Sequence, residues 1–205
     1  ALDDFQRSVT GGWGSAPTGG AWTSAGGTAA GYSVNGTTGL IAGATSANRA
    51  MYLTGATGVE HDITVDVALD QTATGGGAYV SVIGRRVSNG NDYRAKLRFM
   101  STGQVVVQLV RVVGNSETAL ATTTVPGITV TAGTALRVRL ELTGDTTTTA
   151  QAKVWLATSA EPANWTVTNT SATPAVLQAP GHLGLLLYTS GSWSGTAPVL
   201  RVDNL

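Results

Sequence analysis

The chain contains no cysteine among its 205 residues. This absence excludes disulfide bonds, thiolate catalysis and zinc sites built on cysteine ligands. Lysine is also rare, because it occurs only at Lys96 and Lys153, and every other basic residue is arginine. Arginine presents planar, fixed hydrogen-bond donors, so this bias favours directed pairing over a loosely solvated basic surface.

Charge of either sign is scarce. Only 12% of the residues are charged, and 12 basic residues balance 12 acidic ones. Binding to nucleic acid, or to an anionic membrane surface, requires a clustered basic excess that this composition does not supply. No run reaches the ~18 apolar residues of a membrane helix. We therefore expect neither nucleic-acid binding nor membrane insertion.

Helical periodicity is also missing, because no segment of ten or more residues carries it. Apolar and polar residues alternate instead, which is typical of strands with one buried face and one solvated face. Asn35-Gly36 and the segment 88–92 carry strong signals for tight turns. The clearest alternating segments are 62–69, 93–99, 104–113, 136–142 and 151–156.

Shorter or more apolar segments complete the expected strands. Segment 78–87 has the low polarity of a central strand, and segment 182–188 is so apolar that it should be buried on both faces. Segment 160–165 is expected to form a helical turn or an ordered loop. Together the segments predict an all-β fold, a two-sheet antiparallel jelly-roll β-sandwich that forms one domain over residues 1–205, with neighbouring termini. The remaining expected strands are 30–34, 39–42, 49–53, 59–70, 117–123 and 199–205.

Several short motifs resemble those of one family across nearly the whole chain. The sequence is similar to laminin-G-like, concanavalin A-like jelly rolls, especially those of secreted actinobacterial proteins and of minor tail proteins from phages that infect these bacteria. The resemblance implies a non-catalytic glycan- or surface-binding role, sometimes with calcium, in an extracellular or virion-surface protein with neighbouring domains or virion proteins. The motifs are Asp4-Phe5, Gly12–Gly14, Thr18–Trp22, Tyr79–Ile83, Asn91–Arg94, Glu161–Trp165, Gly184–Leu186 and Val202-Asp203.

Two strands carry rows of basic side chains. Arg94, Lys96 and Arg98 share one face of their strand by parity, and Arg137 and Arg139 share one face of another. We expect both rows on a solvated sheet face, where guanidinium groups can bind sugar hydroxyls and carboxylates. The alternative is a solvated face whose charges pair across strands for ~0.2–1 kcal/mol per pair.

Three acidic residues, Glu60, Asp62 and Asp66, share one strand face. Laminarinase-like enzymes of this fold carry a Glu-x-Asp-x-(x)-Glu strand, but Thr64 and Val65 stand where the third acid would be. Retaining glycosidases need two carboxyl groups about 5–5.5 Å apart, and Asp66 lies too far along the strand for this. We expect these acids to pair with arginines across the sheet, and we expect the chain not to be an enzyme.

The chain ends supply a candidate metal site. Asp3 and Asp4 lie at the start and Asp203 lies at the end, so neighbouring termini would bring their carboxylates together. Hard oxygen ligands of this kind suit Ca²⁺. The alternative is that these acids accept hydrogen bonds from turn amides or pair with Arg7 or Arg201.

Aromatic residues suggest where a ligand would lie. Trp193 occupies the tip of the Ser/Gly-rich loop 190–195, and Tyr188 precedes it, so both are candidates for stacking against sugar rings. Trp13 and Trp22 are either ligand platforms or a plug at the end of the sandwich, and the plug is favoured because large aromatics more often bury area.

No residue set supports hydrolysis by a catalytic triad, and no glycine-rich segment matches a phosphate loop. His61 and His182 lack ligand-spaced partners and are expected to be structural. The sequence therefore predicts a non-catalytic carbohydrate- or cell-surface-binding module that contacts glycans through the residues named above. The alternatives are a structural phage tail domain for host attachment and a divergent glycoside hydrolase.

Overall fold

A computed structural model describes all residues 1–205, which form 16 strands in two antiparallel sheets of eight strands each. In spatial order the first sheet contains β1 (Ser8–Thr10), β4 (Tyr32–Asn35), β5 (Gly39–Ala42), β16 (Val199–Asp203), β7 (His61–Leu69), β12 (Leu136–Thr143), β13 (Thr147–Leu156) and β14 (Val167–Ala172). The second sheet contains β11 (Ser116–Thr124), β10 (Val105–Val113), β9 (Asn91–Phe99), β8 (Ala78–Ser88), β15 (Gly181–Thr189), β6 (Asn48–Gly58), β3 (Gly20–Ala25) and β2 (Ser15–Ala16).

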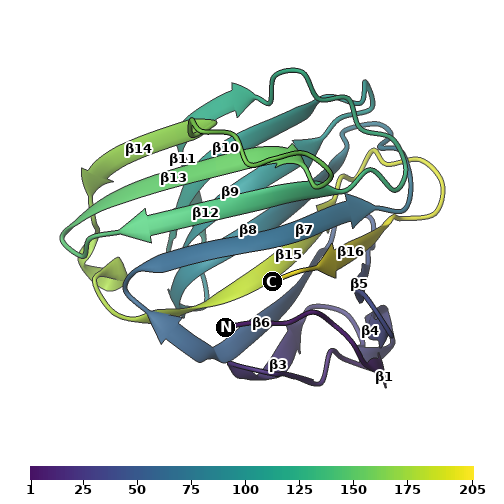
Figure 1. Cartoon of the computed structure of the whole chain (residues 1–205), viewed down its shortest axis with the longest axis horizontal. Helices are drawn as coiled ribbons and strands as arrows, with labels where there is room; N and C mark the ends of the chain where they lie inside the picture. Colours follow the sequence, from purple (N-terminus) through teal and green to yellow (C-terminus); the bar gives the residue numbers. More distant parts are fainter.

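The two sheets pack face to face, as predicted (Figure 1). Strand β12 shows why the chain folds this way. Its even-numbered residues, from Leu136 to Leu142, are fully buried, while the alternate Arg137 and Arg139 point away from the core. The inward residues of both sheets join one cluster of 42 buried residues. Strands β8 and β15 occupy the centre of the second sheet, as their low polarity predicts.

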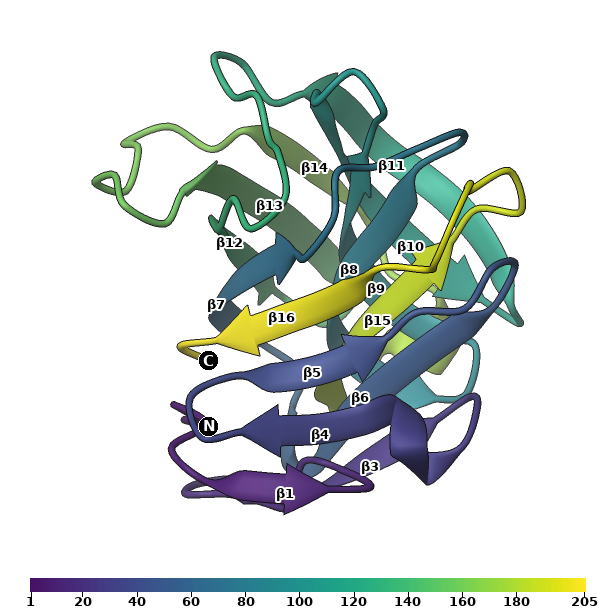
Figure 2. The same ribbon diagram turned by 90° about the vertical axis from the view of Figure 1, so that its right-hand side faces the viewer.

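The chain ends lie beside each other (Figure 2). The Asp3 amide donates to the Leu205 carbonyl at 2.7 Å, and the Leu205 amide donates back to the Asp3 carbonyl at 3.1 Å. This pair of hydrogen bonds closes the first sheet's side of the domain and confirms the prediction of neighbouring termini.

Three aromatic rings fill one end of the sandwich. The Trp13 ring centroid lies 5.1 Å from that of Phe5 and 4.9 Å from that of Trp22, both in edge-to-face geometry. All three side chains are buried, and the Trp13 indole N–H donates to the Leu40 carbonyl at 3.0 Å. The interpretation of these tryptophans as a plug is therefore confirmed.

A buried arginine joins the two sheets. Arg85 of β8 is fully buried and adopts the left-handed backbone conformation, with φ at 48°, where the pairing of β8 with β9 becomes irregular. Its guanidinium donates to the Val59 carbonyl at 2.5 Å, to the Thr148 hydroxyl at 2.6 Å and to the Gly144 carbonyl at 2.7 Å. No carboxylate pairs with it, so neutral acceptors from the first sheet's side hold this charge.

Helical structure is confined to two 3₁₀ turns of three residues each, η1 (Ala29–Gly31) and η2 (Ala175–Leu177). Neither is long or apolar enough to be a membrane span. Segment 160–165 forms an ordered loop without a helical turn.

Candidate ligand-binding cleft

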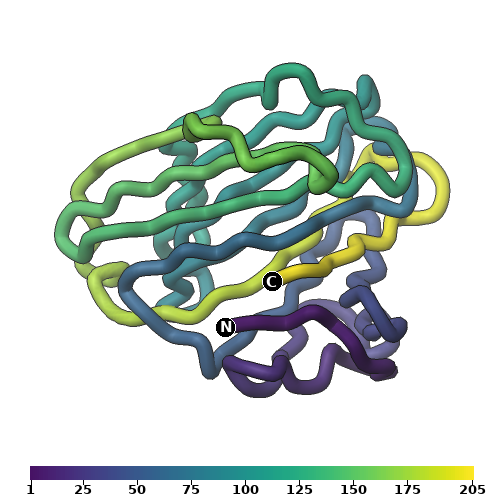
Figure 3. Tube along the Cα trace, viewed as in Figure 1, coloured from purple at the N-terminus to yellow at the C-terminus, as the bar shows by residue number.

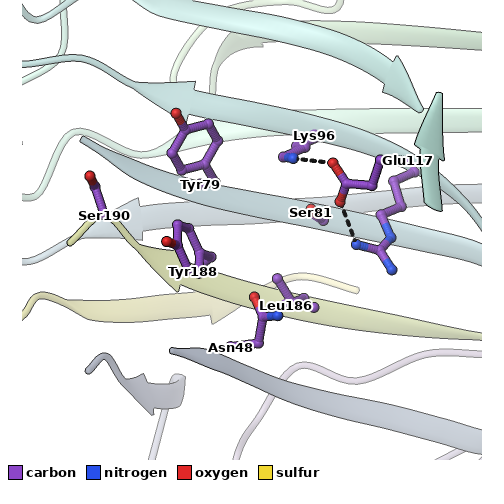
Figure 4. Close-up of a pocket in the computed structure, with 9 residues that line it drawn as sticks. Asn48, Tyr79, Ser81, Lys96, Glu117, Leu186, Tyr188 and Ser190 are labelled. Carbon is purple, nitrogen blue, oxygen red and sulfur yellow. Dashed lines mark hydrogen bonds and ion pairs between the residues drawn. The ribbon is translucent and has the colours of Figure 1, made fainter. Parts of the chain in front are cut away.

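A cleft of about 450 Å³ lies on the outer face of the second sheet. Its walls come from β6, β8, β9, β11 and β15, together with the start of the loop after β15 (Figure 4). The residues that line the cleft are Asn48, Tyr79, Ser81, Arg94, Lys96, Glu117, Leu186, Tyr188 and Ser190.

Strand register explains why these side chains meet. Tyr188 pairs with Asn48 on one neighbouring strand and with Tyr79 on the other. The next row of outward-pointing side chains includes Ser81 of β8, which pairs with Lys96 of β9. Residues directly opposite in antiparallel strands point to the same face, so each row runs across the sheet. The rings of Tyr79 and Tyr188 are tilted, with centroids 5.8 Å apart.

The cleft has an apolar floor. Ala50, Ile83 and Leu186 form a separate buried cluster outside the main core, and Tyr52 and Tyr188 pack against it. A sheet face that only meets solvent carries polar side chains along its strands. This face therefore combines apolar and aromatic side chains with the polar side chains that make up most of the cleft lining.

One hydroxyl group in the cleft has no partner. The Ser81 side chain is fully buried, and its Oγ makes no hydrogen bond within the chain. Buried polar groups are nearly always hydrogen-bonded, so an unpaired one needs an explanation. Ser81 lines the cleft, but a ligand group would reach its hydroxyl only after the side chains that cover it moved apart.

The charged residues of the cleft form one connected network. Arg94 donates to both carboxylate oxygens of Asp92, at 2.5 and 3.0 Å, and to Glu117 at 3.1 Å. Lys96 also bonds to Glu117. Burial raises the pKa of Asp92 above its usual value, although hydrogen bonds from Arg94 oppose the shift. Both carboxylates therefore have cationic partners, which fix them in place.

A second cavity, of about 210 Å³, continues the cleft along the same sheet face. It shares Asn48, Arg94 and Leu186 with the cleft and extends towards Tyr52 and Arg86. We call the two cavities together the groove.

The predicted residues Tyr188, Arg94 and Lys96 meet in the cleft. Arg98 lies on the same strand face, where its guanidinium carbon is 5.5 Å from the centroid of the Tyr79 ring. Whether these residues bind a ligand stays a prediction, but the structure brings them together.

The expectation that both basic rows occupy one solvated face is wrong. Arg137 and Arg139 belong to β12 of the first sheet, so they lie on the opposite side of the sandwich from β9. Arg137 binds both carboxylate oxygens of Asp66, at 2.6 and 2.7 Å, and Arg139 binds both oxygens of Asp62, at 2.8 and 2.7 Å. The expected pairing with arginines across the sheet is thus confirmed for Asp62 and Asp66, but it is wrong for Glu60, which accepts a hydrogen bond from the Gly144 amide at 3.1 Å.

A loop also covers part of the row on β12. Glu161, in the loop after β13, accepts hydrogen bonds from Arg139 at 2.8 Å and from Lys153 at 2.9 Å. The trace in Figure 3 shows this green loop in front of the first sheet. These contacts leave Arg139 saturated by two carboxylates.

Trp193 is not an exposed platform. It is only 6% exposed and belongs to the main core cluster. Its indole N–H donates to the Thr196 carbonyl at 2.9 Å, because the loop folds back over the end of the sandwich. The prediction of an exposed, stacking Trp193 is therefore wrong, whereas Tyr188 lies in the cleft beside Tyr79.

The predicted calcium ligands are occupied by other contacts. Arg7 binds both carboxylate oxygens of Asp3, at 2.7 and 2.8 Å, and the Trp22 indole N–H donates to one of them at 2.8 Å. Asp203 accepts from the Asn204 amide within its own turn, and no group of three or more acidic or histidine side chains is placed to hold a metal ion. The structure therefore contradicts the predicted site at Asp3, Asp4 and Asp203.

Both histidines make structural contacts, as expected. His61 Nε2 lies 3.0 Å from the Gly58 carbonyl and 3.1 Å from the Gly181 carbonyl. His182 Nε2 lies 2.9 Å from a guanidinium nitrogen of Arg86, so it accepts a hydrogen bond and the ring is neutral.

Sequence reasoning missed Tyr79, Ser81 and Glu117. The low polarity of segment 78–87 predicts a central strand, and that prediction assigns no ligand-binding residue to it. Its alternation carried a signal, because Tyr79, Ser81 and Ile83 fall on one face by parity. A tyrosine and a serine next to each other on that face mark a polar surface over the sheet centre.

No protein-family model matches the chain, and no curated protein matches it. Solved structures do match. The β-glucanase of Bacillus licheniformis superposes with a TM-score of 0.59 at 14% identity, covering 100% of this chain and 94% of that one. Lectin I-B4 from Griffonia simplicifolia superposes with a TM-score of 0.51 at 8% identity, covering 89% and 90%.

The chain also matches the GH43 protein BlXynB of Bacillus licheniformis, with a TM-score of 0.55 at 12% identity. The match covers 98% of this chain and 38% of BlXynB, so the chain spans well under half of that protein. Identities this low show the fold alone. The fold is the concanavalin A-like jelly-roll sandwich that lectins and glucanases share.

Proposed function

We propose that this chain is a non-catalytic carbohydrate-binding domain whose ligand lies in the cleft on the outer face of the second sheet. The observation that carries the proposal is the joint placement of two tyrosine rings in a cleft whose other lining residues are mostly polar. The rings of Tyr79 and Tyr188 lie side by side, with centroids 5.8 Å apart, and Leu186 lines the cleft next to them.

Such a surface suits sugar rings in two ways. The apolar faces of a pyranose pack against tyrosine rings, which keep their hydroxyl groups in water. Ligand sites of this kind combine apolar side chains with a few well-placed polar groups, and Asn48 and Ser190 supply polar groups here. The sandwich is shared with a lectin and a β-glucanase, so a carbohydrate ligand is consistent with the fold.

A binding role is favoured over hydrolysis by the state of the carboxylates. Both carboxylate oxygens of Asp92 accept hydrogen bonds from Arg94, and Glu117 forms ion pairs with Arg94 and Lys96. A glycosidase needs one carboxyl group free to donate a proton to the leaving oxygen. We place such a domain where polysaccharides are exposed, on a secreted protein or on a virion surface.

A polysaccharide array tests the proposal. The wild-type chain should bind at least one polysaccharide, and Tyr188→Ala should lower that binding at least tenfold. Trp165→Ala is the matched control, because Trp165 is a half-buried aromatic in the loop over the first sheet. Equal loss in both variants, or no binding to any polysaccharide, would contradict the proposed site. Release of reducing sugar from a bound polysaccharide would instead favour the glycosidase.

A further inference from the structure

Two arginines have no carboxylate partner: Arg86, which lines the groove at one end, and Arg98, which lies just outside its other end. The guanidinium carbon of Arg86 is 3.9 Å from the centroid of the Tyr52 ring. Arg98 lies beside Tyr79 and donates only to the Gly76 carbonyl, at 3.2 Å. Neither takes part in any ion pair of the chain, although six other basic residues do.

The acidic residues of the groove cannot compensate these two charges. Asp92 and Glu117 are the only acids that line the groove, and both are already bonded to Arg94 or Lys96. The acids without an ion pair line neither cavity of the groove. They are Asp4, Glu60, Asp70, Asp145 and Asp203.

The groove is therefore locally positive on a neutral protein. Arg86, Arg94 and Lys96 line the groove with three positive charges against two negative ones, which leaves +1, and Arg98 beside Tyr79 adds a further positive charge next to the groove. The chain as a whole carries a net charge of zero. A concave surface that concentrates charge of one sign attracts ligands of the other sign.

Arg86 lies close over the Tyr52 ring, whereas Arg98 makes a longer contact with the Tyr79 ring, 5.5 Å from its centroid. Tyr52 itself lies against the sheet because its cross-strand partner is Gly184, where an added Cβ would approach the Tyr52 ring to 2.4 Å. Arg86 then covers this ring, and its Nη atoms contact His182 at 2.9 Å and Asn89 at 3.3 Å. A guanidinium fixed over an aromatic ring keeps its edge N–H groups available for a planar acceptor.

Taking the proposed carbohydrate-binding function as its basis, we propose that the groove binds a polysaccharide that contains uronic acids. Arg86 and Arg98 bind the carboxylates of two sugar units, while Tyr188 packs against a ring between them. A uronate carboxylate matches the guanidinium fork and accepts two parallel hydrogen bonds. Neutral glycans would leave both positive charges without a partner in the groove.

Pairs of polymers that differ only in their carboxyl groups test this inference. We would titrate the protein with polygalacturonate and alginate, and with each polymer after chemical reduction of its carboxyl groups, by isothermal calorimetry. The wild-type chain should bind at least one acidic polymer and should bind its reduced form at least tenfold more weakly. Arg86→Gln and Arg98→Gln should each weaken binding of the acidic polymer about tenfold, since hydrogen bonds to charged groups are the stronger class.

The control variant is Arg111→Gln. Arg111 also lacks an ion pair, but it donates to the Ala172 carbonyl at 3.3 Å and lies outside the groove, so its loss should leave binding unchanged. Equal binding of an acidic polymer and its reduced form would overturn the uronate inference and leave the proposed function standing. Equal binding of polyglutamate would also overturn it, because polyglutamate carries carboxylates without sugar rings. Failure to bind any polysaccharide would overturn both proposals.

Discussion

Replacing Arg85 with methionine tests how the two sheets are joined. Arg85 is fully buried, and its guanidinium bonds to the carbonyls of Val59 and Gly144 and to the Thr148 hydroxyl. Methionine fills a similar volume but donates no hydrogen bond. Both side chains are unfavourable in the left-handed backbone conformation, so the backbone contribution largely cancels.

The expected loss follows from the acceptors left behind. The Thr148 hydroxyl keeps Thr173 as a partner at 2.6 Å, so the loss falls on the two carbonyls: that of Val59 loses its donor, and that of Gly144 keeps only a long 3.4 Å contact with the Thr148 hydroxyl. Each unpaired buried acceptor costs about 1–3 kcal/mol. Burial of the methionine side chain offsets about 1.5–3 kcal/mol. The midpoints of these ranges leave a net loss of about 2 kcal/mol, or about 4–8 °C in Tm for a domain of this size.

Thermal and urea unfolding followed by circular dichroism would measure this loss. Arg85→Lys should be destabilised too, because one ammonium group cannot reach three acceptors in the same geometry. Arg111→Met, at a partly exposed position, should change the free energy of unfolding by less than about 0.5 kcal/mol. An Arg85→Met variant as stable as the wild type, or more stable, would refute the view that this hydrogen-bonded charge holds the sheets together.

Three further predictions concern stability. Asp3→Asn should lower the free energy of unfolding by about 2–4 kcal/mol, since it leaves Arg7 without its buried partner; equal stability in urea would contradict this. Trp193→Ala should cost about 3–5 kcal/mol through the cavity it creates, while an exposed ring would cost almost nothing in the same assay. Burial and the nearby positive charge of Arg86 lower the pKa of His182 in the folded state. As the pH falls, the unfolded state therefore takes up this proton before the folded state does, and the free energy of unfolding should decrease below about pH 6.5. Tm measured from pH 7.5 to 5 should decline less in His182→Asn, and an unchanged slope would contradict the assignment.

Most of the fold was predictable because the strands alternate cleanly. The segment Leu136–Leu142 shows four buried apolar residues interleaved with polar ones, and turn residues separate it from its neighbours. Such local patterns determine which side chains face inward. They do not determine which strands share a sheet, because that depends on pairing between distant segments. This is why the row on β9 and the row on β12 were expected together and lie on opposite faces.

The candidate site was predictable only in part, for the same reason. Tyr188 was identified from its position near a loop, but its neighbour Tyr79 lies more than 100 residues away in sequence and meets it only through the pairing of β8 and β15. The composition of the loop around Trp193 did not predict whether this side chain is exposed. A loop rich in serine and glycine suggested exposure, yet the same flexibility lets the chain fold back and bury the ring.

The placement of the ligand on the second sheet is tested most directly by amide chemical shifts in nuclear magnetic resonance spectra. A short oligosaccharide from the polysaccharide that binds most tightly would be titrated into the isotope-labelled chain. We expect the largest shift changes at Tyr79, Ser81 and Tyr188, with the outer face of the first sheet unchanged. Shift changes centred on Arg137 and Arg139, with the cleft silent, would contradict it.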